Sequence, residues 1–172
     1  MGLETPFKYS VRATTLNDAQ SVTALLSDSY PALMKSCYKE PALSTALSII
    51  CKANPSLLSS GTYYLAETQD SLVIGCGGWT RERPGEGNIA PKLGHIRHFA
   101  THSAWVGRGI SRSIYLVCEQ QARKTGITQF ECYSTLNAEG FYAALGFKSI
   151  KPIDVNLSNS VSLPGVLMRR SI

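Results

Sequence analysis

The stretch HSAWVGRGISRSI, residues 102–114, decides the fold because a strand pattern ends there and a helix pattern begins. Gly107 and Gly109 lie at this junction. The first N–H groups of a helix lack partners within the helix and carry partial positive charge. Glycine has no Cβ, so a bulky anion can approach the backbone. The junction predicts a phosphate-binding turn, assisted by Arg108 and Arg112, and the alternative is a tight strand-to-helix turn without a ligand.

Two other glycine patterns do not predict a nucleotide-binding turn. The chain has no G-x-x-x-x-G-K-[ST] pattern. GCGG at 75–78 lies in a β-like run and is followed by WTRERPG, which has no helical pattern, so it is not a dinucleotide fingerprint. We interpret these glycines as a bulge or a close approach of backbone.

The segments around the opening stretch form a strand–helix–strand unit. GHIRHFAT (94–101) and TQFECYS (128–134) have the composition of strands. Between them, residues 109–125 place apolar side chains on one side of a helix that Gly126 ends. Because this helix crosses over between the two strands, we expect them to be parallel.

The rest of the chain alternates strands and helices without a repeat or a linker. The patterns predict a strand over 9–13, a capped helix after it, a helix over 41–53, a hairpin over 61–80, a loop over 81–93, a short helix over 138–147 and two final β runs. Mixed strands with helices between them imply an α/β sheet that is covered on both faces. The 172 residues are enough for one domain with its own core, spanning 1–172.

Composition and charge narrow the range of partners. The net charge of +5 favours phosphates, a nucleotide cofactor or nucleic acid. A nucleic-acid-binding module ranks last, because the sequence lacks basic clusters with interleaved aromatic residues. The five cysteines are dispersed, as in a protein with reduced thiols. No leader pattern and no apolar run of roughly 20 residues is found, so we expect a cytoplasmic protein without a membrane partner.

Two motifs together resemble the GNAT superfamily of acetyl-CoA-dependent N-acetyltransferases. The stretch 98–126 is similar to the family's cofactor motif, Q/R-x-x-G-x-G/A between a strand and a helix, with Val106 in place of Gln or Arg and Ser111 in place of Gly or Ala. NAEGFYAALGF (137–147) is similar to the second motif, an Asn followed by a short helix, an aromatic-Tyr pair and Leu-Gly-Phe. The order of the elements fits the family over nearly the whole chain.

The resemblance implies a fold, a cofactor and a reaction. The fold is a mixed, mostly antiparallel sheet in which a central parallel strand pair splays around the cofactor, with helices on both faces. The reaction is the direct attack of a primary amine, on a small molecule or a peptide, on acetyl-CoA, without a metal. The residues implied to contact acetyl-CoA are Phe99, Ala100, Thr101, Val106, Gly107, Arg108, Gly109, Ile110, Ser111 and Asn137, of which Asn137 can instead cap its helix.

Tyr142 and two histidines are the candidate catalytic residues. Tyr142 lies where the family often places a tyrosine that protonates the leaving thiolate, and the alternative is a packed aromatic beside Phe141 and Phe147. His95 matches the position where some members carry a glutamate base, and imidazole titrates near neutrality. On a regular strand His95 and His98 face opposite sides, so at most one faces the substrate unless a bulge intervenes.

Other assignments of the basic group stay open. Glu67 and Glu131 are weaker candidates that would act through water, and many relatives have no dedicated base. A zinc site made of His95, His98 and His102 is disfavoured, because an extended strand does not bring three side chains together.

Several functions are compatible with these patterns. Within enzymes, the alternatives are transfer of another acyl group or transfer to a hydroxyl. Outside enzymes, the alternative is a non-catalytic acyl-CoA-binding sensor with the same fold. The presence of Tyr142 favours an enzyme over this sensor. The sequence names neither the acceptor nor the oligomeric state, and a homodimer remains open. Cys132 has no visible base and is interpreted as a core residue.

Overall fold

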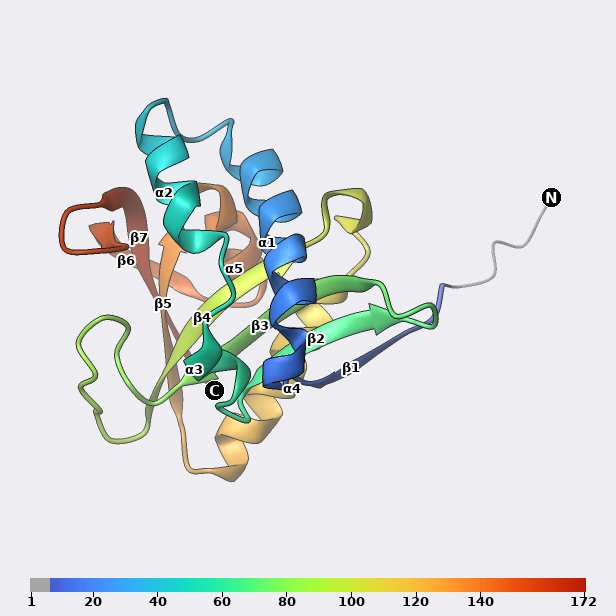
Figure 1. Cartoon of the computed structure of the whole chain (residues 1–172). Coiled ribbons are helices and arrows are strands. Elements are labelled where there is room, and N and C mark those ends of the chain that lie inside the picture. The colour runs from blue at the N-terminus through green and yellow to red at the C-terminus, as the bar shows by residue number, and fades with distance from the viewer. Residues whose placement is uncertain (1–6) are drawn as a thin grey trace.

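A seven-stranded sheet with the order β1-β2-β3-β4-β5-β7-β6 forms the centre of the molecule. The computed structural model describes residues 7–172 (Figure 1), and residues 1–6 of the expected domain lie outside the described part. The strands are β1 (Tyr9–Ala13), β2 (Tyr63–Thr68), β3 (Val73–Thr80), β4 (Leu93–Thr101), β5 (Gln129–Thr135), β6 (Lys148–Asn156) and β7 (Ser162–Ser171). All neighbouring strands are antiparallel except β4 and β5, which are parallel. The expected mixed sheet with a central parallel pair is confirmed.

Helices cover both faces of this sheet. On the face toward the viewer in Figure 1 lie α1 (Ala19–Met34), α2 (Ala42–Ile50) and α3 (Pro55–Leu58). The opposite face carries α4 (Ile110–Lys124) and α5 (Glu139–Ala144), and short 3-10 turns η1 (Leu16–Asp18), η2 (Ser103–Trp105) and η3 (Leu136–Ala138) join some of the elements. Within residues 7–172, no helix is long and apolar enough to cross a membrane.

Helix α4 packs on the sheet through a stripe with helical spacing. Ile110, Ile114, Cys118 and Ala122 are all buried, while Arg112, Arg123 and Lys124 of α4 are exposed. Arg123 and Lys124 occupy the last turn, where cations interact favourably with the helix dipole. This stripe holds the start of α4 firmly at the end of β4.

The glycines of GCGG allow close packing, as the sequence predicted. A Cβ on Gly77 would lie 2.6 Å from the ring of Phe99, and one on Gly75 would lie 2.6 Å from Ile110. The pairing of β3 with β4 shifts its register between Cys76 and Gly78, which is the expected bulge.

The helix predicted over 41–53 is present as α2, which ends three residues earlier, at Ile50. A further turn of helix, α3, which the sequence patterns did not predict, begins at Pro55. The side chain of Asn54 accepts a hydrogen bond from the Ser56 N–H and thereby caps α3. Asn-Pro is a favourable start for a helix, so the second element has a local cause.

Candidate active site

Strands β4 and β5 part in the middle of the sheet. They pair only from Leu93 to His95 on β4 and from Gln129 to Glu131 on β5, although β4 continues to Thr101 and β5 to Thr135. A cavity of about 620 Å³ lies at the parting and is lined by both strands, by the ends of α1 and α2, by the 81–93 loop and by β6 and β7. Past His95, β4 has no strand partner on the β5 side within residues 7–172, so its backbone there is available to a ligand.

The turn before α4 has an open backbone. Gly107 and Gly109 adopt φ values of 78° and 77°, in the left-handed region that favours glycine. A Cβ built on either glycine would meet no atom within 4 Å. The first N–H groups of α4, which begins at Ile110, have no carbonyl partner within the helix. These N–H groups at a helix start can bind an anion, as the sequence predicted.

The side chains of this turn are arranged around that open backbone. The guanidinium of Arg108 lies over the rings of Trp105, at 4.7 Å, and Phe7, at 5.3 Å. Hydroxyl groups of Thr101 and Ser111 are hydrogen-bonded, which fixes the end of β4 to the first turn of α4. Val106 is half exposed, whereas the side chain of Ile110 is in the core, so Ile110 offers a ligand only its backbone.

Tyr142 lines the cavity from α5, and its side chain is buried. Its ring packs edge-on against Phe99 and Phe147. Burial raises the pKa of Tyr142 well above its ordinary value, and the neighbouring Cys132 thiol adds to this effect. The hydroxyl therefore keeps its proton at neutral pH, as an acid must before it acts.

His98 lies at an irregularity of β4. It has a φ of 45°, opposite the register shift of β3, and its backbone carbonyl accepts a hydrogen bond from the Tyr63 hydroxyl at 2.9 Å. The half-buried side chain lines the cavity. Burial, and secondly the charge of Arg97, lowers the pKa of His98 to about 4. His98 is therefore neutral at physiological pH and has a free lone pair.

His95 has a different environment. It is buried and does not line the cavity, and its Nδ1 lies 3.8 Å from Oε1 of Glu131. Burial lowers the pKa of His95, although Glu131 opposes this effect. Glu131 itself is buried, lines the cavity and accepts a hydrogen bond from Arg169 at 2.9 Å. His102 lies instead 3.6 Å from Asp28, so the histidines have separate partners.

The remaining predicted cofactor residues lie along the same path. Phe99 lines the cavity, and its carbonyl accepts a long hydrogen bond of 3.4 Å from the Tyr30 hydroxyl. Ala100 is buried and Thr101 ends the strand. The buried side-chain oxygen of Asn137 in η3 has no hydrogen-bond partner within the described chain. Such an oxygen can accept a hydrogen bond from a ligand.

Comparison with known proteins agrees with this geometry. A family model described as an acetyltransferase (GNAT) domain matches residues 38–156, more than half of the chain. The chain belongs to the GNAT family of acetyltransferases. No curated protein matches it in sequence.

Solved structures of other GNAT proteins share the fold. A GCN5-related N-acetyltransferase from Rhodopseudomonas palustris is 20% identical, with a TM-score of 0.78 over 99% of this chain and 100% of that one. The PaiA N-acetyltransferase from Thermoplasma acidophilum, solved in complex with coenzyme A, is 16% identical, with a TM-score of 0.71 over 96% and 99%. The ribosomal-protein-S18-alanine N-acetyltransferase from Escherichia coli is 11% identical, with a TM-score of 0.62 over 96% and 94%.

The sequence did not single out Arg97, which lines the cavity, or Tyr38, which does not line it but connects elements around it. The Tyr38 hydroxyl donates to the Pro164 carbonyl at 2.7 Å and accepts from the Leu136 N–H at 2.8 Å, so it ties the α1–α2 connection to β7 and η3. The only signal for it was one aromatic residue in the polar stretch SCYKE. Arg97 lines the cavity beside His98, and its signal in the sequence was the one arginine of the strand GHIRHFAT.

Proposed function

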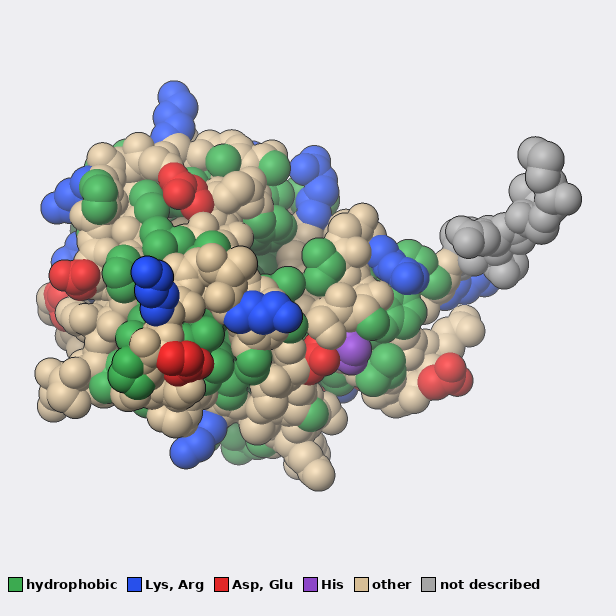
Figure 2. All heavy atoms as spheres, turned by 90° about the horizontal axis from the view of Figure 1, so that it is seen from above, with side chains coloured by type: hydrophobic (Ala, Val, Ile, Leu, Met, Phe, Trp, Pro, Cys, Tyr) green, Lys and Arg blue, Asp and Glu red, His purple; other side chains and the backbone are tan. Residues whose placement is uncertain are grey.

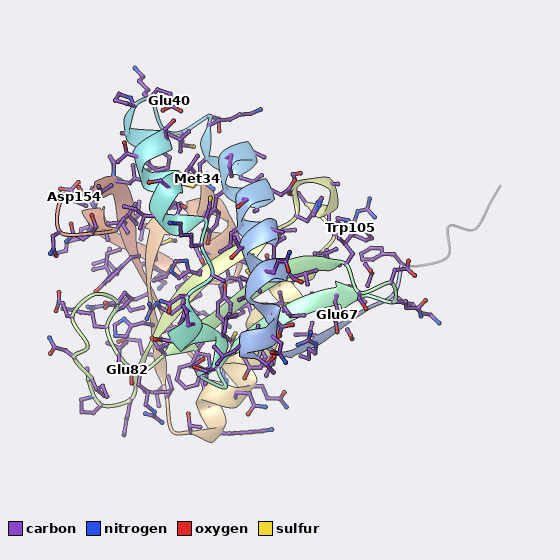
Figure 3. All side chains as sticks on the ribbon, viewed as in Figure 1. Met34, Glu40, Glu67, Glu82, Trp105 and Asp154 are labelled. Carbon is purple, nitrogen blue, oxygen red and sulfur yellow. The ribbon has the colours of Figure 1, made fainter. Side chains whose placement is uncertain are left out.

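We propose that this GNAT protein transfers an acetyl group from acetyl-CoA to a primary amine of a small molecule or peptide, by direct attack of the amine. The main support for this proposal is that β4 and β5 part around a cavity, and that both Tyr142 and His98 line this cavity. The open glycine turn at the end of the same strand supports it. In Figure 3, Trp105 of the turn lies on one side of the molecule and Asp154 of the cavity on the other, with Met34 between them.

The residues present suit acetyl-CoA. The N–H groups from Gly107 to Ser111 would hold the pyrophosphate, with Arg108 and Val106 at the edge of that site. The free edge of β4 from Phe99 to Thr101 would pair with the amide groups of pantetheine, as a further strand would. Asn137 would accept a hydrogen bond from the same ligand with its unpartnered oxygen.

The catalytic residues would act on protons. His98, neutral and in the cavity, would take the proton from the attacking amine, and Tyr142 would give one to the leaving thiolate. His95 is the competing base, because its neighbour Glu131 lines the cavity and can connect it to the amine. The five cysteines are free, in keeping with a reducing, cytoplasmic location.

A panel of amines, amino acids and peptides with acetyl-CoA, followed by release of CoA thiol, tests the proposal. A parallel thermal melt measures binding of acetyl-CoA, and a hundredfold excess over its Kd should raise Tm by about 5–11 °C. Binding without release of thiol, with every acceptor, would favour the acyl-CoA-binding sensor. Absence of both would contradict the whole proposal.

A nucleic-acid-binding role gains no support from the face of the molecule that Figure 2 shows. Figure 2 shows Lys and Arg side chains spread singly over one face, with Asp and Glu between them. A binding surface for nucleic acid needs basic residues gathered on one face or along one groove.

A further inference from the structure

The cavity between β4 and β5 contains the half-buried guanidinium of Arg97, which makes no ion pair within residues 7–172 and interacts with the carboxylate of Glu82 only at longer range. Four basic side chains line this cavity: Lys52, Arg83, Arg97 and Lys151. Lys52 and Lys151 are exposed, so water solvates their charges. Arg83 forms an ion pair with Glu86 at 3.4 Å and lies 3.7 Å from Glu131. Arg97 is half-buried, and its side chain makes no ion pair with the described residues.

Arg97 is held in place with part of its guanidinium free. Its Nη1 donates a hydrogen bond to Oγ1 of Thr80 on the neighbouring strand β3, at 3.1 Å. No protein acceptor within residues 7–172 is bonded to its Nε or Nη2. Nε and Nη2 form a planar edge that matches the two oxygens of a carboxylate in a bidentate pair. The hydrogen bond to Thr80 orders the side chain before a ligand arrives.

The environment of Arg97 favours an anionic ligand. Burial lowers the pKa of Arg97, although a guanidinium stays charged throughout the physiological range. A charge that is partly removed from water is costly unless it gains a partner. A ligand carboxylate at Nε and Nη2 would supply that partner, and it would stand one residue along the strand from His98.

The rest of the cavity limits the size and charge of that ligand. Apolar side chains from α1, α2 and β7 form one wall, among them Met34, Ile50 and Leu163. Carboxylates of Glu131 and Asp154 also line the cavity and disfavour a ligand with several negative charges. The cavity therefore fits a molecule with one carboxylate and an apolar body.

Building on the proposed acetyl transfer, we propose that the acceptor is a free amino acid with an apolar side chain. Arg97 binds its carboxylate through Nε and Nη2. This places the α-amine beside His98, while the side chain lies against Met34 and Leu163. Arg97 is then a specificity-determining residue, because it selects amines that carry a carboxylate on the adjacent carbon.

Matched pairs of ligands test the role of the carboxylate. Leucine is compared with isoamylamine, and phenylalanine with phenethylamine, by calorimetric titration into the CoA-bound protein and by thiol release with acetyl-CoA. In the wild type, the amino acid of each pair should bind about tenfold or more tightly. Arg97→Gln should remove this preference, and Arg97→Lys should keep part of it. Arg81→Gln is the control and should keep it, because Arg81 donates to the Thr125 carbonyl and does not line the cavity.

The outcomes separate this inference from the acetyl-transfer proposal. Equal binding within each pair, or no binding of either amino acid, overturns the assignment of Arg97. If isoamylamine is acetylated as fast as leucine, the result supports the proposed acetyl transfer and contradicts the proposed carboxylate site at Arg97. If Arg97→Gln does not fold, the wild-type pairs and Arg97→Lys still decide the question. Acetyl transfer is judged independently, by acetyl-CoA binding and by thiol release over the whole panel.

Discussion

The Tyr142 hydroxyl is the single group on which the proposed proton transfer to sulfur depends. Tyr142→Phe leaves the ring packed against Phe99 and Phe147 but removes the proton. We expect kcat to fall about 10²-fold with little change in the affinity for acetyl-CoA, because the interaction is made mainly in the transition state. Steady-state kinetics with an accepted amine measure kcat and KM separately.

Tyr115→Phe is the matched control for this substitution. Tyr115 is also a buried tyrosine in the same core, but it does not line the cavity and its hydroxyl accepts from Arg170 at 3.0 Å. Its kcat should stay close to that of the wild type. An unchanged kcat in Tyr142→Phe, when chemistry limits turnover, would leave Tyr142 as a packing residue and strengthen the sensor alternative.

The two histidines differ in their access to the substrate. The resemblance favoured His95, but the geometry favours His98, because only His98 lines the cavity. We expect His98→Asn to lower kcat/KM by about 10²-fold and His95→Asn to lower it less. A larger loss in His95→Asn, measured with the same amine, would show that the proton passes through the His95–Glu131 pair instead.

His98 also predicts a pH dependence of stability. Its folded pKa is about 4, below the value of about 6.5 in an unfolded chain. Between these values the unfolded state binds more protons, so the free energy of unfolding should fall as the pH is lowered from about 6.5 toward 4. Urea unfolding across this range should show a smaller fall for His98→Asn. The control His102→Asn, which keeps a capping acceptor for the Ala104 N–H, should behave as the wild type does. An equal fall of the free energy of unfolding in the wild type and both variants would contradict the lowered pKa of His98.

At the scale of elements, the junction of β4 and α4 forms the proposed phosphate site. Gly109→Glu places a carboxylate beside N–H groups that would face the pyrophosphate, so acetyl-CoA binding should be lost while the fold remains. Gly61→Glu is the control, since Gly61 also has a positive φ and open surroundings but lies before β2. Titration calorimetry with acetyl-CoA measures both. Equal affinity in the two variants would place the phosphate site elsewhere.

Elements with a strong periodic pattern were predictable from the sequence, and the glycines of GCGG indicated a bulge, but the side chains of β4 that the bulge would redirect were not predictable. The stripe from Ile110 to Ala122 defines α4 by itself, and its position between two strands fixes their parallel pairing. The bulge at His98 arises where β4 meets the glycines of β3, a contact between segments about 20 residues apart. No pattern within GHIRHFAT encodes it. The sequence therefore named both histidines without showing which one reaches the cavity.

The cavity depends on even more distant contacts. Arg97 is distinctive because Arg83 has the carboxylates of Glu86 and Glu131 beside it, whereas Arg97 forms no ion pair within residues 7–172. That difference arises from the folded path of the 81–93 loop, which the sequence predicted only as irregular. Tyr38 likewise gains its role from Leu136 and Pro164, roughly a hundred or more residues further along the chain.

At the scale of the whole molecule, within residues 7–172, only three residue pairs, between β4 and β5, join the strands β1–β4 to the strands β5–β7. By contrast, β5 and β7 share seven such pairs. Opening between these two half-sheets would break fewer strand pairs than opening elsewhere in the sheet, although one apolar core that includes Trp79, Phe130 and Met168 extends across both halves. A ligand bound between β4 and β5 would contact both half-sheets and restrain their movement relative to each other.

Amide hydrogen exchange measures the opening between the two half-sheets at each residue. Without ligand, the amides of β4 from Phe99 to Thr101 should exchange faster than those of β2, although both strands lie within the sheet. Acetyl-CoA should slow the β4 amides selectively and leave those at the paired strands β6 and β7 nearly unchanged. Uniform slowing throughout the chain would instead indicate that the sheet moves as one body. Selective slowing would mean that the substrate itself completes the continuity of the sheet, so that the protein is most rigid when it is ready to react.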